Sequence, residues 1–241
     1  INQVLNDSDI DAVVIATPIK SHFTIARKSL ESKKHVFVEK PLTKTVGQAE
    51  KLIDIAKRNK LCLFVGHVFL YNEIFQKIKK IHKNESIKHA NFEWKKLGTF
   101  DEDIFENLLS HDLSLNLELF GMPKKIQLNS KYSLLTPIDR FSLELFFGKT
   151  RRSEITIDRT SHYKKKTVMI TTRKNYYIWD NDELLKFDKK TETYKKIFQS
   201  KNMPLYMECK EFIRIISAKN YSVDSAILAK KISSLILKIP K

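Results

Sequence analysis

Lys34-His35-Val36-Phe37-Val38-Glu39-Lys40-Pro41 is the stretch that decides the fold. It is a short apolar run that stops at a proline, which cannot continue the hydrogen-bond ladder of a strand. Similar runs occur before it, at Asp11–Pro18, and after it, at Leu61–Gly66. Short continuous apolar runs are typical of buried parallel strands. The sequence therefore predicts three such strands.

Helical patterns separate the three runs. Residues 20–32 place Phe23, Ala26 and Leu30 on one helical face, and a second helix follows Thr45, a residue that can cap it. Strand, helix, strand, helix, strand is the pattern of an open parallel sheet, whose ligands bind at the carboxyl ends of the strands. Those ends are Thr17-Pro18, Glu39-Lys40-Pro41 and Gly66-His67, where we expect the chemistry.

The pattern changes after residue 70. Helices are expected at 71–83 and 103–120, the latter capped by Gly121, and in the terminal stretch 205–237. Strands are expected at 87–97, 125–134, 141–147, 153–158, 167–172 and 176–180. Consecutive strands without helices between them favour an antiparallel sheet. We therefore predict an α/β plus α+β chain: residues 1–70 as part of a Rossmann-type domain, and residues 71–241 as a domain with a large open-faced, mainly antiparallel sheet. The alternation in Phe141–Phe146 gives this sheet one apolar face, which is either core or interface.

Composition narrows the function classes. The 241 residues include 44 basic and 28 acidic side chains, a formal net charge of +16. The lysines are scattered, which favours a solvated surface over a nucleic-acid site, and an anionic ligand such as a nucleotide sugar also suits this charge. No apolar run reaches the roughly 20 residues that cross a bilayer. The seven histidines and two cysteines lack metal-ligand spacing. We expect a cytoplasmic protein with no metal, membrane or nucleic-acid partner.

Lys40 and His111 have two interpretations each from the residues alone. A lysine at a strand's carboxyl end can stabilise charge on a substrate oxygen, but it can equally be an exposed turn residue. A histidine titrates near neutral pH and can move protons, but a single histidine on a helix is often structural.

Several of these segments resemble the Gfo/Idh/MocA family of oxidoreductases. The matching elements are Val14-Ile15-Ala16-Thr17-Pro18, then Ser21-His22, then His35-Val36-Phe37-Val38-Glu39-Lys40-Pro41-Leu42. They occur in the family's order and at similar spacing, and the resemblance covers roughly residues 10–125.

The resemblance implies a Rossmann domain, bound NAD or NADP, and hydride transfer at a sugar carbinol. By matching position it implies a cofactor-binding set, which is Thr17, Pro18, His22, Glu39, Lys40 and Pro41. It also implies a catalytic set of Lys40, His111 and Asn107, the last standing four residues before His111 where the family has Asp. An amide can hold a hydrogen bond, but it cannot raise the pKa of a histidine as a carboxylate does.

The segment Val65–Asn72 is similar to a subgroup that acts on nucleotide-linked sugars. This likeness implies substrate-binding roles for His67 and Tyr71. From the residues alone, His67 could instead make a local hydrogen bond at a strand end, and Tyr71 could belong to the core.

A dinucleotide-binding half needs a Gly-x-Gly-x-x-Gly turn after its first strand. The five glycines, at 47, 66, 98, 121 and 148, are not so spaced. We therefore expect an N-terminally incomplete enzyme, lacking the first Rossmann units and exposing a sheet edge.

The leading hypothesis from sequence is an NAD(P)-dependent oxidoreductase that transfers a hydride between nicotinamide and a sugar or nucleotide-sugar carbinol. The resemblance further implies a homo-oligomer, a dimer or tetramer. The alternative is a non-catalytic binding or assembly module of the same fold.

Overall fold

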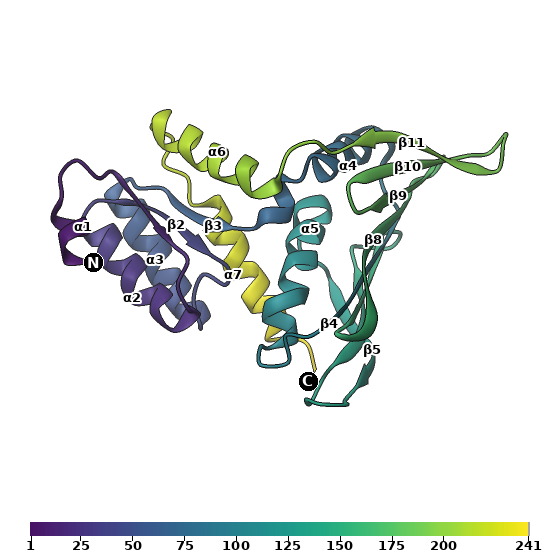
Figure 1. Ribbon diagram of the computed structural model, residues 1–241, viewed down its shortest axis with the longest axis horizontal. Coiled ribbons are helices and arrows are strands. Elements are labelled where there is room, and N and C mark those ends of the chain that lie inside the picture. Colours follow the sequence, from purple (N-terminus) through teal and green to yellow (C-terminus); the bar gives the residue numbers. More distant parts are fainter. Residues whose placement is uncertain (241) are drawn as a thin grey trace. The chain divides into compact units, whose positions relative to one another are not determined.

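The computed structural model describes residues 1–240, which pack as two compact units (Figure 1). Unit 1 consists of Ile1–Val68 together with Pro204–Leu237. Unit 2 consists of Phe69–Met203 together with the last residues from Lys238 onward. Unit 1 is therefore discontinuous in sequence.

Unit 1 is built on a three-stranded parallel sheet in the order β1-β2-β3. The strands are β1 (Ala12–Ile15), β2 (His35–Glu39) and β3 (Leu63–Gly66). The helices are α1 (Asn2–Asn6), α2 (Ile19–Glu31), α3 (Val46–Asn59), α6 (Pro204–Ser217) and α7 (Asp224–Ile236). The three predicted strands and the two helices between them are confirmed, and the Thr45 side chain caps α3 by accepting from the Gln48 amide.

Both faces of the central strand are covered, as a continuous apolar run requires. Val36 and Val38 are fully buried in a core shared with α2, α3 and α7. On the opposite face, the Phe37 ring lies 5.1 Å from that of Phe64 and 5.6 Å from that of Phe212 in α6. The edge strand β1 is less covered, since Val14, which pairs with Phe37, is 66% exposed.

The C-terminal helices pack on the parallel sheet. The Leu63 amide donates to the Ser222 carbonyl at 3.2 Å, and the Val65 amide donates to the Ser225 hydroxyl at 2.9 Å. The sequence-based division placed 205–237 in the second domain, whereas by packing these residues belong to unit 1. The spacing of apolar residues predicts that a segment is helical, but it does not predict which sheet the helix packs on.

Unit 2 is an eight-stranded sheet in the order β11-β10-β9-β8-β4-β7-β6-β5. Its strands are β4 (His89–Leu97), β5 (Lys125–Tyr132), β6 (Arg140–Phe146), β7 (Arg152–Asp158), β8 (Thr160–Thr171), β9 (Tyr176–Asp180), β10 (Glu183–Asp188) and β11 (Thr193–Gln199). All neighbours are antiparallel except β4 and β7, which confirms the predicted mainly antiparallel sheet. The last two strands were not predicted, and β8 begins well before residue 167.

The remaining helical elements are η1 (Val68–Tyr71), which begins at the last residue of the first segment of unit 1, and, in unit 2, α4 (Glu73–Glu85), a π-helical turn η2 (Phe105–Leu109) and α5 (Ser110–Phe120). The predicted single helix over 103–120 thus begins with a wider turn, and Gly121 ends it with a positive φ of 75°.

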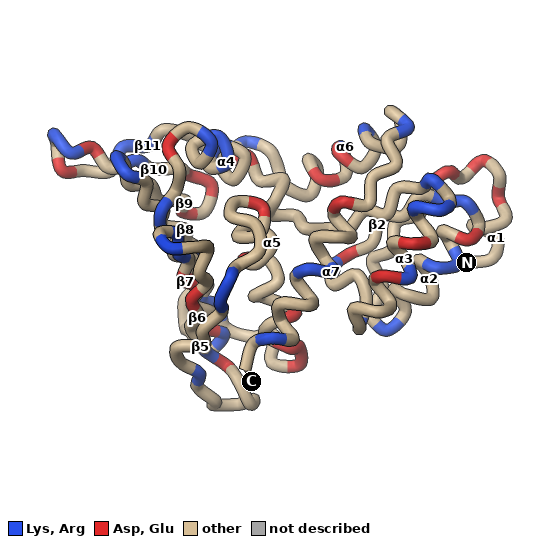
Figure 2. The backbone as a smooth tube through the Cα atoms, turned by 180° about the vertical axis from the view of Figure 1, so that it is seen from behind, with Lys and Arg blue, Asp and Glu red and all other residues tan. Residues whose placement is uncertain are grey.

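The two faces of the large sheet differ in character. Phe141, Leu143 and Leu145 are fully buried, so the apolar alternation of β6 serves the core. The other face carries ion pairs: Glu93 contacts Lys95 and Lys165, each at 2.6 Å. Figure 2 shows basic and acidic positions interspersed along both units. Among residues 1–240, no helix is long and apolar enough to cross a membrane.

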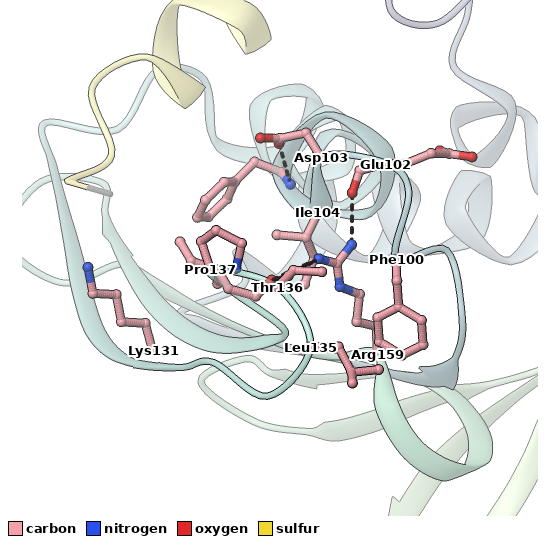
Figure 3. A pocket seen from close by; sticks show the side chains of 11 residues that line it. Phe100, Glu102, Asp103, Ile104, Lys131, Leu135, Thr136, Pro137 and Arg159 are labelled. Atoms are coloured by element: carbon pink, nitrogen blue, oxygen red, sulfur yellow. Dashed lines mark hydrogen bonds between the residues drawn. The ribbon is translucent and has the colours of Figure 1, made fainter.

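A buried arginine joins the β5–β6 loop to the segment before η2 (Figure 3). The Arg159 guanidinium, 3% exposed, pairs with Asp139 at 3.1 Å and donates to the carbonyls of Thr99 and Glu102, each at 2.8 Å. It also donates to the Thr136 hydroxyl and the Ile138 carbonyl. The arginine borders a pocket of about 550 Å³. Because the guanidinium already has five acceptors, it is part of the scaffold of this pocket.

Arg159→Met should lower the free energy of unfolding by about 3–5 kcal/mol, because Asp139 would be left as a buried charge without its cation. Urea denaturation of the two proteins measures this. Arg140→Met is the matched control: its side chain is 54% exposed and lies 4.0 Å from Asp158, so the loss should stay within about 1 kcal/mol. Equal losses in the two variants would contradict the assignment.

Candidate functional site

The carboxyl ends of β1 and β2 are held together by one buried histidine. His22, in the first turn of α2, is 1% exposed. Its Nε2 lies 2.6 Å from the Thr17 carbonyl oxygen and its Nδ1 lies 2.8 Å from the Pro41 carbonyl oxygen. A neutral imidazole carries one N–H and donates to one of these carbonyls, whereas the protonated ring donates to both. His22 therefore fixes the spacing of the two strand ends.

The β1 end leaves a hydroxyl pair at the surface. Thr17 and Ser21 share a hydrogen bond of 2.7 Å, and the Ser21 hydroxyl donates to the Pro18 carbonyl at 2.8 Å. The Thr17-Pro18 loop leads directly into α2.

Glu39 ends β2 opposite Gly66, its partner on β3. A Cβ added at Gly66 would stand 3.1 Å from Oε2 of Glu39. The glycine therefore makes room for this carboxylate to lie across the end of β3. Lys40 follows Glu39, and the Lys40–Pro41 peptide bond is cis.

A second carboxyl group comes from α6. Glu208 is fully buried, and the backbone of His67 comes close enough to its carboxyl group to oppose part of the effect of burial on its pKa. Burial, reinforced by the charge of Glu39, raises the pKa of Glu208 to about 8. At neutral pH Glu208 therefore carries a proton while sitting beside an acidic neighbour.

His67 completes the cluster just after β3. It is 3% exposed, and both ring nitrogens lack hydrogen-bond partners among the described residues. Burial, assisted by the positive charge of Lys40, lowers the pKa of His67 to about 4. The imidazole is therefore neutral at physiological pH and offers one donor and one acceptor to a bound molecule.

We call Glu39, Lys40, His67 and Glu208 the strand-end cluster. It combines a lysine, a neutral imidazole, a carboxylate and a carboxyl group that keeps its proton. These groups can orient a polar ligand and stabilise negative charge that develops on one of its oxygens.

The remaining predicted site residues lie in unit 2. Asn107 is inside the π-helical turn η2, and His111 is in the first turn of α5. π-turns inserted into helices are frequent at functional sites. The His111 ring packs at 5.0 Å from the Phe69 ring and 5.5 Å from the Trp94 ring. Tyr71 ends η1 and is partly exposed.

The sequence places the strand-end residues in one unit and Asn107 and His111 in the other, and it misses Glu208. A signal for Glu208 exists: it lies four residues before Phe212 and seven before Ile215, on the buried stripe of α6. A charged residue on such a stripe indicates an unusual environment.

Comparisons with known proteins assign a family to the segment that contains the strand ends of β1 and β2. Residues 1–67 match the family model GFO_IDH_MocA, described as an oxidoreductase family with an NAD-binding Rossmann fold. This segment contains every residue of the two tied strand ends. The segment belongs to the Gfo/Idh/MocA oxidoreductases.

Individual relatives of this family extend the match. The chain is 30% identical over 178 residues to the uncharacterized oxidoreductase YhhX of Escherichia coli, covering 68% of this chain and 50% of that protein. It is 32% identical over 126 residues to UDP-N-acetylglucosamine 3-dehydrogenase of Acidithiobacillus ferrooxidans, covering 47% and 37%. It is 29% identical over 166 residues to the scyllo-inositol 2-dehydrogenase (NADP(+)) IolW of Bacillus subtilis, covering 62% and 46%. The matched segments thus span half of these relatives or less.

Solved structures show the same fold over the whole chain. UDP-N-acetylglucosamine 3-dehydrogenase GnnA from Acidithiobacillus ferrooxidans superposes with a TM-score of 0.89 at 20% identity, covering 99% of this chain and 80% of that one. At this identity the likeness shows that the two chains share a fold.

The strand-end residues fit a polar ligand such as the nicotinamide end of the family's dinucleotide, whereas the Gly-x-Gly-x-x-Gly turn that would take its pyrophosphate does not occur among the glycines of this sequence. Ligands of open parallel sheets bind at the carboxyl edge, and there the cluster presents two buried imidazole nitrogens without protein partners. Unpartnered buried polar atoms are costly unless a ligand or water satisfies them.

Glu208→Gln should change the pH dependence of stability. The pKa of Glu208 is about 8 when folded, against an ordinary value of 4.5. Because the folded pKa is raised, this group's stabilising contribution is complete below about pH 4.5 and is lost as the pH rises through about 8. Between pH 4.5 and 9, the free energy of unfolding of the wild type should therefore fall by up to about 5 kcal/mol relative to that of the glutamine variant.

Urea denaturation of both proteins at pH 5 and pH 9 measures this difference. Glu31→Gln is the control, since that side chain is 53% exposed and makes only a surface pair with Arg27. A difference between wild type and Glu208→Gln that is the same at both pH values would refute the buried, protonated carboxyl.

Proposed function

We propose that this protein is an NAD(P)-dependent oxidoreductase that transfers a hydride between nicotinamide and a carbinol carbon of a sugar or nucleotide sugar. One observation carries the proposal. The strand-end cluster gathers Lys40, a neutral His67, the carboxylate of Glu39 and the buried carboxyl group of Glu208 at the carboxyl edge of a sheet, within a unit whose residues 1–67 match an NAD-binding family.

Lys40 and His67 of the cluster, and His111 and Asn107 of unit 2, have distinct roles in this proposal. The bound dinucleotide supplies the hydride acceptor or donor. Lys40 donates a hydrogen bond to the reacting oxygen and stabilises the negative charge that develops there. His67, uncharged, binds a neighbouring hydroxyl of the substrate with one of its ring nitrogens. His111 takes up or returns the hydroxyl proton, and Asn107 orients it.

Cofactor contacts are proposed for the exposed side of the strand ends. Thr17 and Pro18 after β1, and Glu39, Lys40 and Pro41 after β2, line this edge. His22 acts behind them, because its ring nitrogens are occupied by the Thr17 and Pro41 carbonyls. We therefore propose that His22 positions the cofactor loops.

The substrate class rests on the relatives and on charge. One relative is named for UDP-N-acetylglucosamine and another for scyllo-inositol. A net charge of +16 suits a substrate that carries a diphosphate. We propose that unit 1 binds the dinucleotide, that unit 2 contributes Tyr71 and His111 toward the substrate, and that the protein assembles as a homo-oligomer.

A non-catalytic binding module is the second candidate. The uncharged Asn107, where the family has Asp, favours it, because an amide cannot share the charge of an imidazolium. Titration of the intact protein with NADH and NADPH, followed by turnover of UDP-sugars and inositols, separates the two candidates. Dinucleotide binding without any turnover would favour the module.

Lys40→Met should reduce kcat by about 10²–10³-fold, because methionine keeps the length of the side chain but cannot stabilise the developing oxyanion. Dinucleotide affinity, measured by NADH fluorescence, should fall much less than kcat, because the other proposed cofactor contacts at Thr17, Pro18, Glu39 and Pro41 remain. Lys44→Met provides the control, since Lys44 is exposed in the loop before α3. Turnover of Lys40→Met close to that of wild type would exclude the proposed role.

A further inference from the structure

Lys166 sits in an aromatic corner of unit 2. It lies on β8, and its Nζ is 3.3 Å from the centroid of the Phe69 ring and 3.6 Å from that of the Trp94 ring. The two rings meet nearly at right angles, with centroids 5.8 Å apart. An ammonium over two aromatic rings is attracted by both of their quadrupoles. The contacts therefore fix the position of this charge.

The same two rings hold His111. The imidazole meets the Phe69 ring edge-on at 88° and the Trp94 ring at 47°. The ammonium of Lys166 and the imidazole of His111 are thus placed by a shared pair of side chains. A displacement of either group changes the packing surface of the other.

Asp112 completes the arrangement from the residue next to His111. It is 1% exposed, and its Oδ1 lies 3.7 Å from the Lys166 Nζ. Burial raises the pKa of Asp112, and the charge of Lys166 opposes that rise. A lysine and a buried acid are therefore held next to the rings that contact His111, whereas position 107 carries an uncharged amide.

We propose that Lys166 is a positioning residue for His111, holding the imidazole through Phe69 and Trp94 and favouring its uncharged form. This inference rests on the proposed function, in which His111 accepts the substrate proton. A nearby positive charge disfavours the imidazolium, and Asp112 offsets part of that effect. Because position 107 carries an uncharged amide, the Lys166–Asp112 pair is the charged arrangement next to the rings that hold His111, and its lysine acts in the opposite direction to a carboxylate at position 107.

Other charged groups on elements that pack against α5 lie farther along the chain. Glu106 is in η2, before the start of α5. Glu118 pairs with Lys79 of α4, two turns beyond His111. On β4, Glu93 and Lys95 alternate with Trp94 and form their ion pairs on the opposite face of the sheet.

An NMR titration of the His111 ring tests the electrostatic part without any substrate. In Lys166→Met the titration midpoint should rise by on the order of one pH unit, and in Asp112→Asn it should fall. Lys166→Met with Asp112→Asn removes both charges, so the midpoint should lie between those of the single variants. This double variant also avoids a buried carboxylate without its cation.

Lys165→Met is the matched control. It is the neighbouring lysine on the same strand, but its ammonium pairs with Glu93 on the other face of the sheet. Its His111 titration should match wild type. A midpoint in Lys166→Met that equals that of wild type, or a double variant whose midpoint does not lie below that of Lys166→Met, would overturn the proposal.

Turnover provides the second measurement. Lys166→Met should lower kcat about tenfold with little change in the KM for dinucleotide, and should move the acid limb of the kcat/KM profile to higher pH. Lys166→Arg keeps the charge and should restore most of the kcat. If the His111 midpoints of the variants move as expected but the wild-type protein shows no turnover, the proposed function alone is refuted. If Lys166→Met is active and the acid limb of its kcat/KM profile does not move, the positioning role is refuted.

Discussion

The two hydrogen-bonding contacts of the His22 imidazole are the interaction on which the strand-end cluster depends. They tie the carbonyl of Thr17 to the carbonyl of Pro41 through one buried ring. Parallel strands make no direct connection beyond their last ladder hydrogen bonds, so the loops that follow them need another constraint. With the Pro41 loop fixed, Lys40 and Glu39 acquire defined positions, and the rest of the cluster packs around them.

Desolvation organises both sets of functional side chains, with opposite outcomes. In unit 1 it is relieved by neutralisation: Glu208 keeps its proton and His67 loses its proton. In unit 2 burial raises the pKa of Asp112, and the ammonium of Lys166, 3.7 Å away, offsets part of that rise. Neutral buried groups suit a site that must accept a ligand's charge, whereas a fixed ion pair suits a scaffold that must keep a neighbouring ring in place.

Local patterns in the sequence predict much of the fold and less of the site. The apolar runs around Val14, Phe37 and Phe64 are sufficient to predict three parallel strands and the edge where their ends meet. Partners distant in sequence leave no such signal: Glu208 reaches Glu39 from the far end of the chain, and Lys166 meets Phe69 across unit 2. The strands β10 and β11 escape prediction because lysines and threonines interrupt their alternation at the exposed end of the sheet.

The discontinuity of unit 1 has a consequence for biosynthesis. Val65 receives its hydrogen-bond partner from Ser225, 160 residues later in the chain. On a ribosome, the large sheet of unit 2 is therefore fully translated while the parallel sheet still lacks α6 and α7, and Phe37 and Phe64 are without their cover from Phe212. Until α6 and α7 have been translated, this apolar surface is open to premature association.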